Sequence, residues 1–99
     1  MQYAVQAVKF SPTAASYRAL GSAYEGAGKT QKAIAAYRQG LGVDPKNAEL
    51  CVVLANIYAK SRDFTKAVGL YERAIQHDPR DVLAYSDLAY VYRETGNEA

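Results

Sequence analysis

The sequence lacks several residues and patterns that mark particular classes of protein. Its 99 residues include no tryptophan, three prolines, one histidine and one cysteine. A single cysteine cannot close an internal disulfide, and one cysteine with one histidine cannot supply the ligands of a metal site. We therefore expect neither a disulfide scaffold nor a metal centre, and the cysteine count indicates no particular compartment.

Long apolar runs and clusters of like charge are also missing. The longest apolar stretch, Leu50 to Ala59, is interrupted by Asn56 and is far shorter than the roughly 18 residues of a membrane-spanning helix. The N-terminal residues have neither the basic start nor the cleavage site of a signal peptide. The net charge of +2 is spread evenly, without a basic patch for phosphate backbones. These absences predict no membrane insertion and no nucleic-acid binding, and they favour a cytoplasmic location.

Alanine and tyrosine are abundant instead, with eighteen and nine copies. Alanine favours helices and lets them approach one another closely. Hydrophobic residues make up 49% of the chain and charged residues 22%, which is typical of a globular protein and not of a disordered one. These values predict one folded domain that is rich in helix.

The dominant feature of the sequence is a repeat of 34 residues. Leucine recurs at positions 20, 54 and 88, tyrosine at 24, 58 and 92, and an Asp-Pro pair at 44–45 and 78–79. Residues 14–47 and 48–81 are identical at eight of the 34 positions. Self-similarity at such a period is typical of repeat architectures, in which each unit packs mainly on its neighbours.

Each unit contains two apolar stripes with helical spacing. The second stripe of the first unit ends at Asp44-Pro45, because the residue before a proline is biased away from helix. Gly40 and Gly42 are expected to loosen this end of the helix. Asp63 and Asp81 are expected to cap the helices that follow them. We predict six helices, at residues 2–10, 14–27, 30–42, 48–61, 64–77 and 82–95.

The spacing Tyr17-x2-Leu20-Gly21-x2-Tyr24, followed by Ala33-x3-Tyr37 and Pro45, resembles the tetratricopeptide repeat. The departures are mild, such as a tyrosine or cysteine where the family has tryptophan. The resemblance implies an all-α, right-handed solenoid of antiparallel helix pairs in a single domain over residues 1–99. Its units are a partial repeat at 2–13, full repeats at 14–47 and 48–81, and a partial repeat at 82–99. A chain that starts and stops in mid-repeat is expected to be a segment of a longer array.

The resemblance further implies a protein-interaction scaffold that binds a protein or peptide. In tetratricopeptide proteins, the side of each first helix that faces away from the core lines a concave inner surface where peptides lie. Asn56 offers a donor and an acceptor for a peptide amide, Tyr90 offers flat contact area, and Arg18 can clamp a carboxylate. The alternative to a binding face is an ordinary solvent-exposed helix surface. Together with a helical wheel, the resemblance implies these partner-binding residues: Arg18, Ser22, Glu25, Glu49, Val52, Asn56, Lys60, Ser86, Tyr90 and Arg93.

One specific family function can be tested on the sequence. Some tetratricopeptide proteins grip the acidic C-terminal tails of chaperones with two lysines, two asparagines and an arginine. The matching positions here are Arg18, Ser22, Val53, Leu83 and Asp87. Only Arg18 is suitable, and Asp87 would repel a carboxylate, so this function is not expected.

The main alternative function is self-assembly into a homo-oligomer through the terminal helices. Helix 82–95 has an apolar stripe with less protein to bury it than the other helices have. This exposed stripe, together with the half-repeat at 2–10, is expected to recruit a second chain if the alternative holds. The stripe consists of Leu88, Ala89, Val91 and Tyr92.

An enzyme is not expected, and neither is a cofactor. Cys51 is interpreted as a small, half-buried hydrophobic residue, and His77 as a favourable charge at the end of a helix. Antiparallel packing could bring these two side chains together. A Cys–His nucleophile, however, also needs an orienting group and an oxyanion site, and the sequence offers neither.

Overall fold

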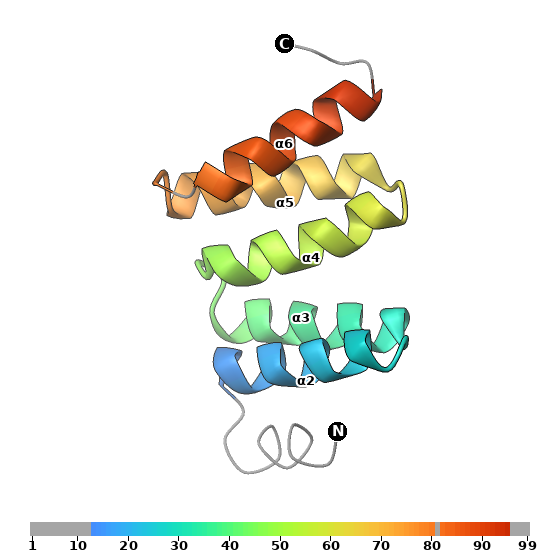
Figure 1. Cartoon of the computed structure of the whole chain (residues 1–99). Helices are drawn as coiled ribbons and strands as arrows, with labels where there is room; N and C mark the ends of the chain where they lie inside the picture. The colour runs from blue at the N-terminus through green and yellow to red at the C-terminus, as the bar shows by residue number, and fades with distance from the viewer. Residues whose placement is uncertain (1–12, 81, 96–99) are drawn as a thin grey trace.

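The computed structural model describes residues 13–80 and 82–95, and five helices form this part of the chain (Figure 1). Each helix agrees with its predicted range to within one residue at either end. The predicted helix 2–10 and the predicted cap Asp81 lie outside the described residues. The five helices are α2 (Ala14–Gly26), α3 (Thr30–Val43), α4 (Ala48–Lys60), α5 (Phe64–His77) and α6 (Val82–Thr95).

The helices form two layers of an elongated stack about 44 Å long. Each helix packs on the next one along the chain, and α4 also contacts α6. Figure 1 shows α2, α4 and α6 in the layer nearer the viewer, with α3 and α5 behind them. The predicted all-α solenoid of helix pairs is therefore confirmed.

The first helix of each full unit begins with a side-chain cap. The Thr13 hydroxyl accepts a hydrogen bond from the backbone N–H of Ser16 at 3.2 Å, and the Asn47 side chain accepts one from Leu50 at 3.0 Å. These bonds satisfy backbone donors that a helix start leaves free. The expected cap at Asp63 is wrong, because this residue makes no side-chain cap bond. Its carboxylate instead lies 3.6 Å from the amino group of Lys66.

Both helix pairs are joined by the same kind of turn. Gly28 has a φ of +76°, and Arg62, which lies 34 residues later, has a φ of 61°. After each of these residues, a backbone N–H bonds back to a carbonyl inside the helix, from Lys29 to Tyr24 and from Asp63 to Tyr58, both at 2.8 Å. This is the glycine-type C-terminal motif of helices, which needs a left-handed residue. The turn tolerates arginine at Arg62 at a conformational cost that glycine avoids.

Replacing Gly28 by alanine is expected to lower the free energy of unfolding by about 1 kcal/mol, because a Cβ is strained at positive φ. The matched control is Gly26→Ala, at a helical position where an added Cβ meets nothing within 4 Å. This control is expected to gain up to about 1 kcal/mol from helix propensity. Urea unfolding followed by circular dichroism measures both changes. Equal effects of the two substitutions would contradict the strain argument.

The core is formed where the two layers meet. Its largest fully buried side chains are Tyr37, Tyr71, Leu50, Val91 and Cys51. The expectation of a half-buried Cys51 is thus wrong, because no part of this side chain is exposed to solvent.

Gly40, which was predicted to loosen the end of α3, has a packing role in the structure. Gly40 is buried, and a Cβ placed there would lie 2.9 Å from the Leu50 Cδ1 atom and 3.2 Å from the Cβ of Tyr17. Real side chains almost never tolerate the shorter of these separations. Gly40 therefore lets α4 and α2 pack closely against α3, and the lost helix propensity is the cost of that contact.

The apolar stripe of α6 is better covered than the sequence predicted. Val91 is fully buried, and Leu88 packs partly buried against the same cluster as Tyr71. Tyr92 is also partly buried, and its hydroxyl donates to Glu72 of α5 at 3.0 Å. Only Ala89 of the stripe is exposed. The α5–α6 contact covers most of the surface on which the self-assembly alternative depended.

Candidate partner-binding face

The ten residues predicted to bind a partner lie on the three helices of one layer. We call this set the first-helix face: Arg18, Ser22 and Glu25 of α2; Glu49, Val52, Asn56 and Lys60 of α4; Ser86, Tyr90 and Arg93 of α6. Eight of the ten are exposed, whereas Val52 and Asn56 are partly buried. Val52 packs against the core, so it contributes mainly to stability.

A hollow of about 230 Å³ brings together three of these residues, Asn56, Lys60 and Tyr90. Tyr71 of α5 also lines it, and its hydroxyl donates a hydrogen bond to the Asn56 side-chain oxygen. This bond occupies an acceptor of Asn56 but leaves its amide N–H groups for another ligand. Tyr90 is 47% exposed beside the hollow and offers a large, rigid contact surface. The remaining lining residues are Ala59 and Asp87.

A second hollow of about 230 Å³ connects α2 with the end of α4. It is lined by Glu25 and by Lys60, which also lines the first hollow. The Glu25 carboxylate accepts a hydrogen bond from the Tyr37 hydroxyl at 2.5 Å. Lys60 thus places a flexible positive charge between two depressions on the same face. The other lining residues are Thr30, Ile57 and Ser61.

Two predicted residues pair with each other. The guanidinium of Arg18 lies 2.6 Å from the Glu49 carboxylate, and this ion pair joins α2 to α4. The sequence suggested that Arg18 is available to bind a partner's carboxylate, but in the structure its guanidinium is already paired with Glu49. Both side chains are about half exposed, so the pair contributes at most about 1 kcal/mol and a partner can displace it. Ser22, Ser86 and Arg93 line neither hollow.

The sequence reasoning missed the contribution of the two buried tyrosines. Tyr37 and Tyr71 occupy the position where the family pattern has phenylalanine, and neither was among the predicted partner-binding residues. Each ring is buried, yet each hydroxyl reaches a polar residue of the first-helix face. The available signal was the hydroxyl itself, because a buried tyrosine usually finds a hydrogen-bond partner.

Ionisation of these phenols is strongly disfavoured. Burial raises the pKa of Tyr37 well above its ordinary value, and the hydrogen bond to Glu25 and the negative charge of this residue raise it further. Burial also raises the pKa of Tyr71, with a smaller contribution from the negative charge of Asp87. Both hydroxyls therefore remain protonated donors at neutral pH.

The surroundings of Cys51 do not favour a nucleophile. Burial raises the pKa of the Cys51 thiol, and the nearby positive charge of Arg73 only partly opposes this shift. A buried thiol with a raised pKa is a poor nucleophile at neutral pH. His77 is exposed at the end of α5. Within residues 13–80 and 82–95, no three histidine, cysteine, aspartate or glutamate side chains are grouped as a metal site would require.

Comparison with protein families identifies the repeat. Models of the tetratricopeptide repeat match residues 14–57, 48–81 and 70–99, which together cover nearly the whole chain. The chain belongs to the tetratricopeptide repeat family. None of the helices in the described part of this repeat chain is long and apolar enough to cross a membrane.

The curated relatives are much longer proteins. Tetratricopeptide repeat protein 21B of Mus musculus is 33% identical over 78 residues, and its human counterpart is 32% identical over 74 residues. These matches cover 79% and 75% of this chain but only 6% of each relative. The inactive peptidyl-prolyl cis-trans isomerase shutdown of Bombyx mori is 43% identical over 44 residues, which are 44% of this chain and 10% of that protein.

Solved structures share the fold. The crystal structure of MamA superposes with a TM-score of 0.82 at 27% identity, over 86% of this chain and 50% of that chain. The N-terminal domain of stress-induced protein-1 from C. elegans gives a TM-score of 0.79 at 20% identity, over 85% of this chain and 72% of that one. The second likeness concerns the fold alone. Family and fold together support a general role as a protein-interaction scaffold.

Proposed function

We propose that this tetratricopeptide chain binds a peptide or a surface element of a partner protein on the first-helix face. The observation that carries the proposal is the pair of hollows that share Lys60, with Tyr90 half exposed beside one of them. An exposed aromatic ring next to polar groups that can still form hydrogen bonds is typical of residues that dominate binding energy. No catalytic step is part of this function.

Tyr90→Ala is expected to weaken binding of a first-helix-face ligand about tenfold or more, because it removes the largest exposed side chain of the face. Peptides for the measurement come from a display library selected against the parent protein. Fluorescence anisotropy with the selected peptides then gives the dissociation constants of parent and variant.

Tyr85→Ala is the matched control, because Tyr85 is a tyrosine of the same helix with 48% exposure. Five residues separate it from Tyr90, so the two side chains point about 140° apart around α6. Binding is expected to be unchanged in this control. If no selected peptide distinguishes Tyr90→Ala from Tyr85→Ala, the assignment of the face is wrong.

Self-association through the terminal helices stays a prediction of the sequence. Light scattering after size exclusion tests it, since a monomer has a mass of 10.8 kDa. A constant monomeric mass over a wide concentration range would contradict self-assembly. A growing mass would support it.

A further inference from the structure

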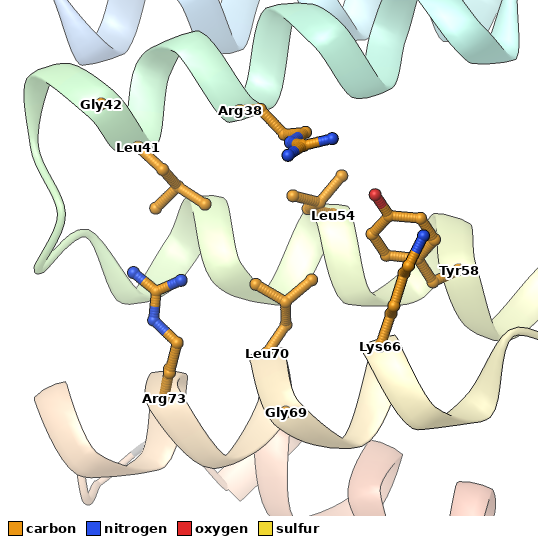
Figure 2. Close-up of a pocket in the computed structure, with 9 residues that line it drawn as sticks. All are labelled: Arg38, Leu41, Gly42, Leu54, Tyr58, Lys66, Gly69, Leu70 and Arg73. Carbon is orange, nitrogen blue, oxygen red and sulfur yellow. The ribbon is translucent and has the colours of Figure 1, made fainter.

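A larger cavity, of about 550 Å³, is lined by residues of α3, α4 and α5. It is a groove between α3 and α5, and α4 forms its floor (Figure 2). We call it the second-helix groove. No residue of this groove belongs to the first-helix face. A volume of this size lies within the range of sites that hold ligands.

The floor of the second-helix groove is apolar. Leu41 of α3, Leu54 of α4 and Leu70 of α5 point into the same space, with the Tyr58 ring beside them (Figure 2). Leu41 and Leu54 belong to the buried core, and Leu70 and Tyr58 are partly buried against it. The groove is therefore a depression in the core surface, and an apolar side chain that entered it would be shielded from water.

The rim of the groove is positively charged. Arg38 of α3 and both Lys66 and Arg73 of α5 surround the floor, and none of the lining residues is acidic (Figure 2). No hydrogen bond or ion pair with a described residue holds Arg38. Lys66 has a distant pair with Asp63, at 3.6 Å, and Arg73 has one long bond, at 3.3 Å, to the backbone oxygen of Pro45.

The three positive charges of the rim are only weakly neutralised, and they therefore favour a negatively charged ligand. Three cations around one apolar depression repel one another, and a ligand with carboxylates relieves that repulsion. Arginine is well suited to the task, because its guanidinium binds a carboxylate through two parallel hydrogen bonds. A basic or purely apolar ligand would leave the rim unpaired.

A glycine of α5 leaves open space along one wall of the groove. Gly69 faces the groove from α5, and a Cβ added there would meet no atom within 4 Å. The corresponding residue of the first repeat, 34 positions earlier, is Ala35. A single methyl group at this position therefore leaves the groove open, whereas a larger side chain would fill it.

We propose that the second-helix groove binds an acidic peptide segment with one large apolar side chain. The apolar side chain lies against Leu41, Leu54 and Leu70, and flanking carboxylates pair with Arg38 and Arg73. The site is separate from the first-helix face, so the two surfaces can hold different segments of one partner or two partners at once. The charge complementarity of the rim is the observation that selects this occupant.

An unbiased peptide display library, selected against the complete chain, provides the probes. The proposal expects a class of enriched peptides with several aspartates or glutamates around a leucine, phenylalanine or tryptophan. Their affinity for the parent protein is measured by fluorescence anisotropy. Raising the salt concentration is expected to lower the affinity of these acidic peptides, because their binding depends on partly exposed charges.

Gly69→Leu is the decisive variant, because its side chain fills the groove where the structure leaves open space. It is expected to weaken the acidic class about tenfold or more. Gly69→Ala is the matched control, which strengthens the same helix but leaves most of the groove open. This control is expected to bind as the parent does. Circular dichroism and thermal unfolding check that both variants stay folded.

Arg38→Glu tests the charge, and it is expected to weaken the acidic class at least as much as Gly69→Leu does. Tyr90→Ala separates this site from the first-helix face, since it should leave the acidic class unchanged. The proposal is overturned if selection yields no acidic class, or if that class binds Gly69→Leu as tightly as the parent. Sensitivity of the acidic class to Tyr90→Ala in place of Gly69→Leu would also overturn it, while supporting the function proposed above.

Discussion

Replacing Leu50 by alanine will lower the free energy of unfolding by about 2–5 kcal/mol. Leu50 has no exposed surface, and it is among the largest fully buried side chains of the described residues. It lies at the start of α4 with one methyl group packed directly against Gly40 of α3. The substitution removes three carbon atoms from this contact, and the two helices cannot close the gap without shifting. A cavity therefore adds to the lost burial.

Val43→Ala is the control for this experiment. Val43 ends α3 and is 52% exposed, so truncation there is expected to change stability by less than about 0.5 kcal/mol. Urea unfolding followed by circular dichroism gives both values. A chain of this length has about 5–15 kcal/mol of stability in total, so the Leu50 variant is expected to be close to unfolding. A loss below about 1 kcal/mol would mean that the α3–α4 contact is not a cooperative part of the fold.

The repeat pattern predicted the helices, but it did not indicate that Leu50 is deeply buried. The corresponding residues are Ser16 in the first repeat and Ala84 in the third, so the position shows no common apolar character. Its burial depends on the neighbouring helix α3, where Gly40 leaves room for a large side chain. Periodicity within a helix shows which face is buried, but it does not show how deeply a neighbouring repeat covers each residue.

Helix boundaries were predictable because local chemistry sets them. The Asp-Pro pairs follow the ends of α3 and α5, as the sequence predicted for the first unit. A turn with Gly28 at positive φ separates α2 from α3. The individual caps were less predictable. Asp63 was expected to cap α5 and does not, whereas Thr13 and Asn47 cap the first helices. A capping residue type only permits the bond, and the backbone and neighbouring charges decide whether it forms.

The sequence predicted which side of each helix forms the candidate face, but it did not predict the contacts between residues of different helices. A helical wheel placed Asn56, Lys60 and Tyr90 on one side of their helices, and the structure brings them together in one hollow. The wheel could not show that Arg18 pairs with Glu49, because they belong to different helices. The second-helix groove was missed for the same reason. Its walls come from three helices, and no local pattern records how such helices are spaced.

Both full repeats have a tyrosine where the family pattern has phenylalanine. We expect these two tyrosines to make the protein lose stability at alkaline pH. Tyr37 and Tyr71 are each 2% exposed, and both have a pKa above the ordinary value of about 10. The unfolded chain releases their protons near pH 10, whereas the folded chain keeps them to higher pH. Their contribution to stability is therefore fully present below about pH 10 and is lost as the pH rises above it.

The size of this loss follows from proton linkage. Each tyrosine that is protonated in the folded state and ionised in the unfolded state lowers the free energy of unfolding by about 1.4 kcal/mol per pH unit. Together Tyr37 and Tyr71 are expected to remove roughly 2.8 kcal/mol per pH unit above about pH 10. Urea unfolding at a series of pH values from about 9 to 11.5 measures the slope.

Phenylalanine variants assign the loss to the two residues. Tyr37→Phe and Tyr71→Phe are each expected to reduce the slope by about half, because neither variant has a proton to release at that position. Tyr85→Phe, which removes a half-exposed hydroxyl, is the control and is expected to keep the slope of the parent. At neutral pH, each buried variant should lose about 1 kcal/mol, since Glu25 or Asn56 loses its hydrogen bond from the phenol. A parent slope that survives both substitutions would show that other groups cause the alkaline unfolding.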